Sequence, residues 1–159
     1  MNTELDRLLS LEAIRNLRIQ YCHFLDTNRI DELAQLFTED AICFVAGAGW
    51  QGREAIRNGL SRAFAEYDAQ HRGTYPFLHS ISNHWIEIVS EDRAEGRCYL
   101  TDFVIERPAG ISPLLLLGSY ADEYLRVDGK WLISRTRLDV VWPEPDVGGG
   151  VPGNVLVLP

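Results

Sequence analysis

Residues 77–88, FLHSISNHWIEI, combine the alternation of a β-strand with side chains that can carry out chemistry. Alternate residues of a strand point to the same side, which places His79 and Asn83 on one face. A histidine can act as a general base near neutral pH, and an asparagine can hydrogen-bond a substrate oxygen or orient a water. Because neither face is uniformly apolar, the pattern predicts either a cavity wall with His79 as the base or a strand whose histidines lie at a solvent-exposed end.

A histidine base needs a partner that fixes its tautomer and stabilises the imidazolium formed on proton abstraction. Asp26, which ends the stretch YCHFLD, is the candidate, and Tyr21 in the same stretch could donate a hydrogen bond to a carbonyl or enolate oxygen. At about 100° per residue, Asp26 lies about 140° around a helix from Tyr21. Both reach one pocket only if the helix stops near Asp26 or the pocket wraps around its end. The alternative is a turn aspartate beside a core tyrosine.

The stretch SRTR places Arg135 and Arg137 on one face of another predicted strand. An arginine inside a pocket could stabilise a leaving anion or bind a substrate carboxylate. The alternative is a pair of exposed arginines that face Asp122 or Glu123 of the neighbouring strand. Tyr120 is a further candidate to line the cavity and contact the substrate.

Composition and motifs exclude several classes of protein. The chain has 15 basic and 23 acidic side chains, a formal net charge of −8, which opposes binding to nucleic acid. It contains no phosphate-binding loop, dinucleotide fingerprint, serine elbow or metal-ligand motif, so we expect no cofactor and no metal. Apolar runs are too short for a membrane span, and the start lacks the features of a secretory signal. We therefore expect a cytoplasmic protein that binds a small molecule.

Periodicity indicates which elements position these groups. Apolar residues at helical spacing predict a long helix over 3–26, whose apolar positions are interrupted by Arg15 and Arg18. A short second helix within 26–37, a strand over 41–47 and a third helix over 52–67 follow. The rest reads as four longer strands over 78–89, 94–106, 114–127 and 131–142, the last two joined by the Asp-Gly hairpin signal of VDGK.

Helices followed by a run of strands predict an α+β fold. Long twisted strands form a sheet that curls, and helices must then cover its concave face. We therefore expect a cone-like α+β barrel, in which three helices pack on a strongly curved, mostly antiparallel sheet that encloses a pocket. The length of 159 residues fits one domain over 1–145, followed by a Gly/Pro-rich C-terminal tail over 146–159.

Taken together, these segments resemble the SnoaL-like branch of the nuclear-transport-factor-2-like superfamily. LLSLEAIRNLRIQYCHFLD followed by DELAQLFTEDAICFV is similar to its amino-terminal signature, and HSISN and YADEYLRVDGKWLISRTR are similar to its later strands. The resemblance covers residues 3 to about 142. Nearest in motif are scytalone dehydratase, bile-acid dehydratase and hexachlorocyclohexane dehydrochlorinase. These enzymes use an Asp–His pair to remove a proton while a hydroxyl or chloride leaves from the adjacent carbon.

The resemblance implies a role for each matching residue. It makes Asp26 and His79 the catalytic pair and Asn83 the asparagine of the His-x-x-x-Asn motif. Tyr21 fits the spacing of the bile-acid dehydratase tyrosine, where the dehydrochlorinase has a lysine. The resemblance therefore favours loss of water over loss of halide.

Two departures from the family pattern change the expectations. The last-strand arginine of the family falls on Thr136, between Arg135 and Arg137, so a one-residue bulge would be needed to bring an arginine into the cavity. The strand AICFVAG lacks the tyrosine that scytalone dehydratase has there, so scytalone itself is not the expected substrate.

The predicted function is that of a dehydratase-like lyase, a hydro-lyase that uses an Asp–His dyad and no cofactor. It would eliminate water from a small hydroxylated, cyclic or aromatic substrate in a cavity lined by residues such as Leu25, Phe44, Ile81 and Leu116. An isomerase or cyclase on the same scaffold and a non-catalytic small-molecule binding domain are the alternatives, because this architecture serves many functions.

We also expect a homo-oligomer, a dimer or a trimer, because sheets of this type usually cover their outer face by self-association. Trp85, Trp131 and Trp142 are the candidate interface residues.

Overall fold

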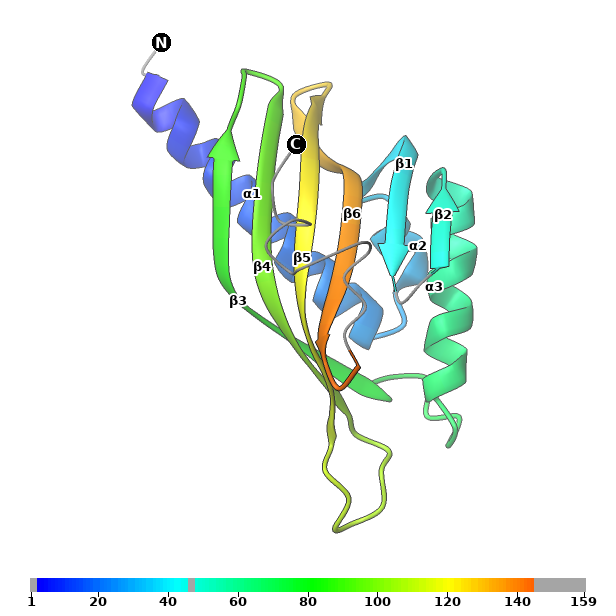
Figure 1. The fold of residues 1–159 in the computed structure, drawn as a ribbon. Coiled ribbons are helices and arrows are strands. Elements are labelled where there is room, and N and C mark those ends of the chain that lie inside the picture. The colour runs from blue at the N-terminus through cyan, green and yellow to red at the C-terminus, as the bar shows by residue number, and fades with distance from the viewer. Residues whose placement is uncertain (1–2, 46–47, 145–159) are drawn as a thin grey trace.

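The computed structural model describes residues 3–45 and 48–144, in which three helices pack on a six-stranded sheet (Figure 1). The helices are α1 (Thr3–Asp26), α2 (Ile30–Ala34) and α3 (Arg53–Tyr67). The strands are β1 (Phe37–Val45), β2 (Ala48–Gln51), β3 (Phe77–Ile88), β4 (Arg93–Val104), β5 (Leu114–Val127) and β6 (Lys130–Trp142). Their order in the sheet is β2-β1-β6-β5-β4-β3, and of these pairings that of β1 with β6 is parallel.

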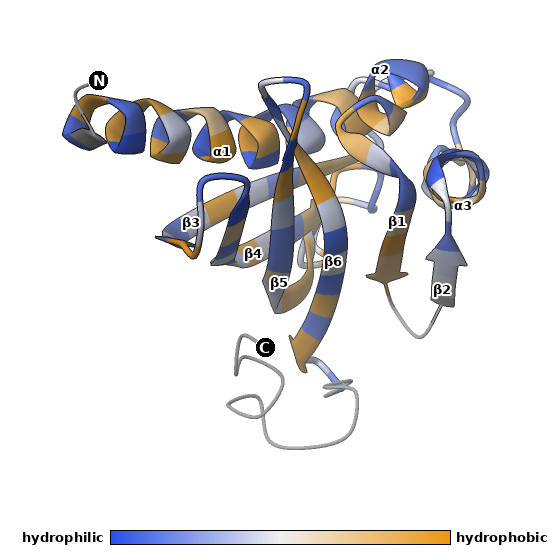
Figure 2. Ribbon diagram, turned by 90° about the horizontal axis from the view of Figure 1, so that it is seen from above, coloured by the Kyte–Doolittle hydropathy of each residue, from blue (hydrophilic) through white to orange (hydrophobic). Residues whose placement is uncertain are grey.

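The predicted fold class is confirmed: three helices pack on a curved, mostly antiparallel sheet. Figure 2 shows α1 lying across one face of the sheet, with α3 beside β1 and β2 at its edge. The four long strands lie within two residues of their predicted bounds. The β5–β6 hairpin also forms as predicted, because Asp128 and Gly129 have the positive φ angles, 49° and 79°, that a tight two-residue turn requires.

The edge of the sheet differs from the prediction. Strand β1 begins at Phe37, four residues before the predicted strand, and β2 was not predicted. The polar residues Glu39 and Asp40 indicated a boundary in the sequence, but they are exposed within β1 and therefore interrupt nothing. The short segment AGWQ of β2 carries too little apolar alternation to be read as a strand. Residues 46–47 and the predicted tail over 146–159 lie outside the described residues, so the domain boundary stays a prediction.

Helix α1 buries one face against the sheet, as its spacing predicted. Ile14, Leu17, Tyr21 and Leu25 are each at most 7% exposed, and burying such side chains stabilises the fold by roughly 1.5–3 kcal/mol each. Arg15 is exposed, whereas Arg18 is completely buried. None of the helices in the described ranges is long and apolar enough to cross a membrane. The cytoplasmic location stays a prediction.

Candidate active site

Asp26 and His79 meet where the end of α1 faces the start of β3. Oδ1 of Asp26 lies 2.6 Å from Nδ1 of His79, and Oδ2 accepts the backbone N–H of His79 at 3.1 Å. Both side chains are buried, with 6% and 7% exposed, respectively. A carboxylate that holds Nδ1–H fixes the ring and leaves Nε2 as the proton acceptor.

The end of α1 is held in the position that this pair requires. The helix stops at Asp26, and Asn28, with a φ of 58°, turns the chain away from the helix axis. The backbone carbonyl of Asp26 then accepts the N–H of Tyr75 at 2.7 Å, which ties the segment before β3 to the helix end. Asp26 and Tyr21 were expected to serve one site only if the helix stopped near Asp26. Helix α1 does end at Asp26.

A third titratable group, Asp102 of β4, lies beside this pair. It is the direct cross-strand partner of His79, and its Oδ2 is 3.7 Å from Nε2 of His79. Its buried Oδ1 has no hydrogen-bond partner among the described residues. Burial raises the pKa of Asp102 to about 6, and Asp26 adds to the rise, while His79 and the backbone N–H of Phe103 oppose it.

The raised pKa of Asp102 predicts a pH-dependent stability. The folded protein holds the Asp102 proton up to about pH 6, whereas an aspartate of the unfolded chain has its ordinary pKa of 3.8, so the wild type loses stability as the pH rises through this window. We expect Asp102→Asn to raise the free energy of unfolding by about 3 kcal/mol at pH 7 and to leave it unchanged below pH 4. Chemical denaturation at several pH values measures this, with the exposed Glu91→Gln as control. A gain independent of pH would contradict the prediction.

His79 and Asp102 face a cavity of about 360 Å³ between the helices and the concave face of the sheet. Tyr21 and Tyr120 line the same cavity, and α3 contributes Tyr67. The other lining side chains are mainly apolar and include Leu25, Trp50, Leu60, Phe77, Leu116 and Leu138. Such an arrangement, a few polar groups in an apolar wall, is typical of small-molecule sites.

Asp26 does not line this cavity. It borders a second cavity of about 310 Å³ on the other side of the His79 ring, together with His23 and Ile81. The ring of His79 therefore separates the two cavities, with Asp26 behind it and Asp102 in front of it. Of the predicted apolar lining, Leu25 and Leu116 line the front cavity, whereas Phe44 is 39% exposed and lines neither of these two.

Tyr21 and Tyr120 form one wall of the front cavity. Their rings pack edge to face with centroids 6.0 Å apart, and each residue is 1% exposed. Both side chains line the cavity, so a ligand there can contact them. Burial raises the pKa of Tyr21 above its ordinary value, which keeps its hydroxyl a neutral donor.

Asn83 does not share the face of His79, and that expectation is wrong. A β-bulge interrupts the pairing of β3 with β4 between Ser82 and Trp85, and Asn83 has a φ of 52°. A bulge adds a residue and reverses the alternation beyond it. Asn83 is consequently exposed, and His84 and Ile86 point inward beyond the bulge instead of Asn83 and Trp85.

Arg135 follows the alternative of an exposed arginine that faces Glu123, whereas Arg137 pairs with a residue of its own strand. Arg135 lies on the outer face, 3.6 Å from Glu123, and its side chain is 52% exposed. Arg137 binds Asp139 at 2.8 Å. Neither arginine lines the cavity that contains His79, because Thr136 between them is the residue that points inward.

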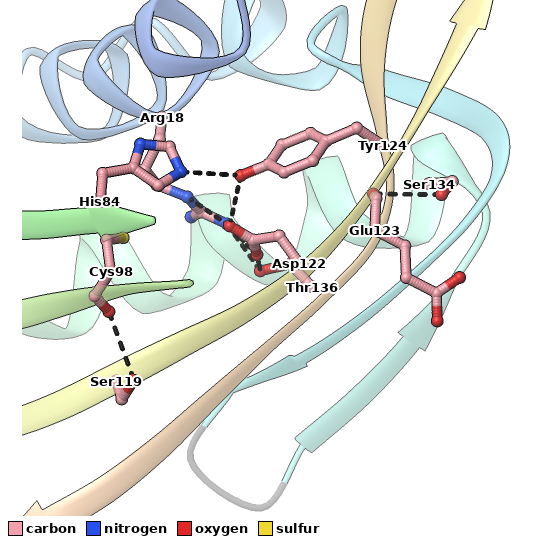
Figure 3. Close-up of polar contacts among 9 residues, drawn as sticks. All are labelled: Arg18, His84, Cys98, Ser119, Asp122, Glu123, Tyr124, Ser134 and Thr136. Atoms are coloured by element: carbon pink, nitrogen blue, oxygen red, sulfur yellow. Dashed lines mark hydrogen bonds and ion pairs between the residues drawn. The ribbon is translucent and has the colours of Figure 1, made fainter. Parts of the chain in front are cut away.

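The guanidinium beside Thr136 comes from α1 instead. Nη2 of Arg18 donates to Oγ1 of Thr136 at 2.7 Å and to Oδ1 of Asp122, and Nε donates to Oδ2 of Asp122 at 3.1 Å. Figure 3 shows the network continuing from Asp122 through Tyr124, whose hydroxyl donates at 2.7 Å, to His84. Burial lowers the pKa of His84 to about 4, so it is neutral near pH 7.

Neither Asp102 nor the Arg18 network could be recognised from a sequence pattern. The strand positions of Asp102 and His79 were predicted, but their pairing depends on the register that the β3–β4 turn imposes. Arg18 was predicted to lie in the first helix, but its partner could not be identified from the sequence, because Asp122 lies 104 residues away. In the described part of the chain, no group of three or more His, Cys, Asp or Glu side chains is arranged to hold a metal ion.

Comparisons with known proteins agree with this architecture. A family model of the SnoaL-like domain matches residues 6–137. A protein assigned as a scytalone dehydratase from Novosphingobium aromaticivorans is 28% identical, and the match covers 92% of this chain and 97% of that one with a TM-score of 0.74.

Two further solved structures share the fold at lower identity. A hexachlorocyclohexane dehydrochlorinase from Novosphingobium barchaimii is 23% identical over 93% of this chain and 97% of that one, with a TM-score of 0.72. An NTF2-like protein with a cystatin-like fold from Novosphingobium aromaticivorans is 22% identical over 99% and 97%, with a TM-score of 0.73. Since the family model spans most of the described domain, this chain belongs to the SnoaL-like domain family.

Proposed function

We propose that this protein is a carbon–oxygen lyase that eliminates water from a small hydroxylated substrate. The observation that carries the proposal is the 2.6 Å contact between Asp26 and His79, with His79 in the wall of a cavity of about 360 Å³. The substrate would bear an acidic C–H next to a carbonyl or an aromatic system. The similarity to a protein assigned as a scytalone dehydratase supports the same class of reaction.

The proposed reaction begins with proton transfer. Nε2 of His79 takes the acidic C–H proton, and the carboxylate of Asp26 stabilises the imidazolium through Nδ1. A correctly placed base of this kind accelerates the step by about 10²–10⁴-fold. The hydroxyl of Tyr21 donates to the carbonyl oxygen, which carries the negative charge of the enolate.

Asp102 completes the elimination. The electron pair of the broken C–H bond forms the new C=C bond as the C–O bond breaks, and the leaving hydroxyl takes the proton of the Asp102 carboxyl to become water. With a pKa of about 6, the Asp102 carboxyl is mostly protonated below pH 6 and keeps roughly a tenth of its protonated form at pH 7. The imidazolium then returns its proton to Asp102 across the 3.7 Å between Nε2 and Oδ2, so one cycle consumes no net proton.

A screen of hydroxylated cyclic and aromatic ketones tests the proposal. We expect the protein to convert a member of this panel to a product lighter by one water, measured by mass spectrometry, and expect His79→Ala to be inactive. A product of unchanged mass with a shifted double bond would replace the lyase by an isomerase. Binding without conversion by the wild type would leave a non-catalytic binding domain.

We further propose that the protein is a homo-oligomer that covers the outer face of its sheet. Of the three predicted tryptophans, Trp131 is buried in the core, whereas Trp85 and Trp142 are 50% and 44% exposed. Tyr99, 54% exposed on β4 next to β3, extends the apolar surface around Trp85. Aromatic residues are enriched at the centre of interfaces, which fits the exposed pair Trp85 and Tyr99, although Arg97 lies directly opposite Trp85.

Self-association is measured by light scattering after size exclusion. We expect a dimer or trimer for the wild type and a shift toward the monomer for Trp85→Glu/Tyr99→Glu, because two buried carboxylates oppose association. Leu8→Glu, on an exposed position of α1, is the control and should leave the assembly unchanged. A wild type that stays monomeric at high concentration would contradict the proposal.

A further inference from the structure

The guanidinium of Arg18 lies against the two tyrosines that line the cavity. Its central carbon is 4.0 Å from the ring centroid of Tyr120 and 4.6 Å from that of Tyr21. Arg18 itself is completely buried and does not line the cavity. The two aromatic rings therefore stand between the positive charge and the ligand space.

The ion pair with Asp122 does not use all the hydrogen-bond donors of the Arg18 guanidinium. Nε and Nη2 of Arg18 bind Asp122 and Thr136, but the buried Nη1 has no hydrogen-bond partner among the described residues. A buried ion pair is often no more stable than well-packed apolar residues of the same volume. The contact that distinguishes this guanidinium from a simple internal pair is the one with the rings of Tyr21 and Tyr120.

That contact has a chemical consequence for the two hydroxyls. A cation on the face of an aromatic ring is attracted by its electron density and draws on it. The phenol hydroxyl then becomes a stronger hydrogen-bond donor, and donors of this kind bind best to an oxygen that carries negative charge. The carboxylate of Asp122 only partly offsets the cation, because Thr136 and Tyr124 also donate to it at 2.6 and 2.7 Å.

We propose that Arg18 is a positioning residue that holds Tyr21 and Tyr120 as a pair of hydroxyl donors for an anionic oxygen of the ligand. In the reaction this oxygen is that of the enolate, and in this respect the inference rests on the proposed function. The ligand class is correspondingly an enolisable ketone or a phenol whose oxygen gains negative charge when bound.

Substituted phenols of graded acidity test this without any turnover. Their affinities are measured by titration below pH 6, where Asp102 is mostly protonated, for the wild type and for Arg18→Met/Asp122→Asn. The double substitution removes both charges and keeps one side-chain oxygen at position 122 as an acceptor for Thr136 or Tyr124. We expect the affinity of the wild type to rise about 10-fold from the least to the most acidic phenol, because charge-assisted hydrogen bonds are roughly twice as strong as neutral ones.

In the double variant we expect the neutral phenol to bind as before and the rise with acidity to disappear. Tyr120→Phe should lower the rise, whereas Tyr67→Phe, which alters a cavity tyrosine that does not contact Arg18, should leave it unchanged. Arg18→Lys, which keeps the charge, should retain most of it. If the double variant fails to fold, Arg18→Gln/Asp122→Asn takes its place with the same expectation.

The outcomes separate this inference from the proposed function. A wild type without any dependence on acidity, or a double variant that keeps the full dependence, would overturn the role of Arg18. A normal dependence in a protein that eliminates no water would overturn the proposed function and leave the donor pair in place.

Discussion

We expect the replacement of His79 by alanine to lower kcat by about 10²–10⁴-fold, because the proposed reaction would lose its general base. The variant loses the edge-to-face contact of the ring with Phe77, but the backbone N–H of residue 79 still donates to Asp26, so the fold should remain intact. The measurement is kcat on the substrate found in the ketone screen, with circular dichroism to check the fold. His71→Ala, which alters an exposed histidine outside both cavities, is the matched control.

Asp26→Asn should reduce kcat by a similar factor for a different reason. The amide cannot stabilise the imidazolium, and its N–H₂ group can favour the tautomer in which Nε2 carries the proton and is no base. KM should change little, because Asp26 lies behind the ring and does not line the front cavity. A variant at either position with unchanged kcat would exclude the Asp26–His79 pair from the chemistry.

The sequence predicted the parts of the site whose positions follow from local structure. The helical spacing of apolar residues predicted that Tyr21 lies on the buried face of α1 and that the helix extends to Asp26. The alternation of residues 77–88 predicted a strand with His79 close to its start. Their contact is long-range, yet the order of elements leaves few ways to cover a curved sheet, so the prediction needed only the fold class.

What the sequence could not predict depends on register and on partners distant in the chain. Asn83 was assigned by strict alternation, and one bulge reversed its side. Asp102 is opposite His79 only because of the register of β3 and β4. Arg18 interrupts an apolar helix face, and no local pattern indicates that a carboxylate from β5 will meet it.

The second large effect is on stability and concerns this buried pair. Arg18→Met should lower the free energy of unfolding by about 3–5 kcal/mol, because it leaves the carboxylate of Asp122 buried without its cation. Asp122→Asn should cost a similar amount, since the guanidinium of Arg18 is completely buried and would lose its counter-ion. Denaturant unfolding of the two single variants measures both losses.

The double variant decides whether these losses come from the charges or from the packing. If an uncompensated charge causes them, Arg18→Met/Asp122→Asn should be more stable than either single variant by at least about 1–2 kcal/mol, because neighbouring groups in one network are strongly non-additive. The pair Arg135–Glu123, on the partly exposed outer face, is the control, and its cycle should give less than about 1 kcal/mol. If the losses of the two single variants add up in the double variant, the packing of the two side chains, and not their charges, accounts for the loss of stability. Recovery in the double variant would mean that the fold tolerates a neutral pair, and that the charge of Arg18 serves the two tyrosines in the cavity wall.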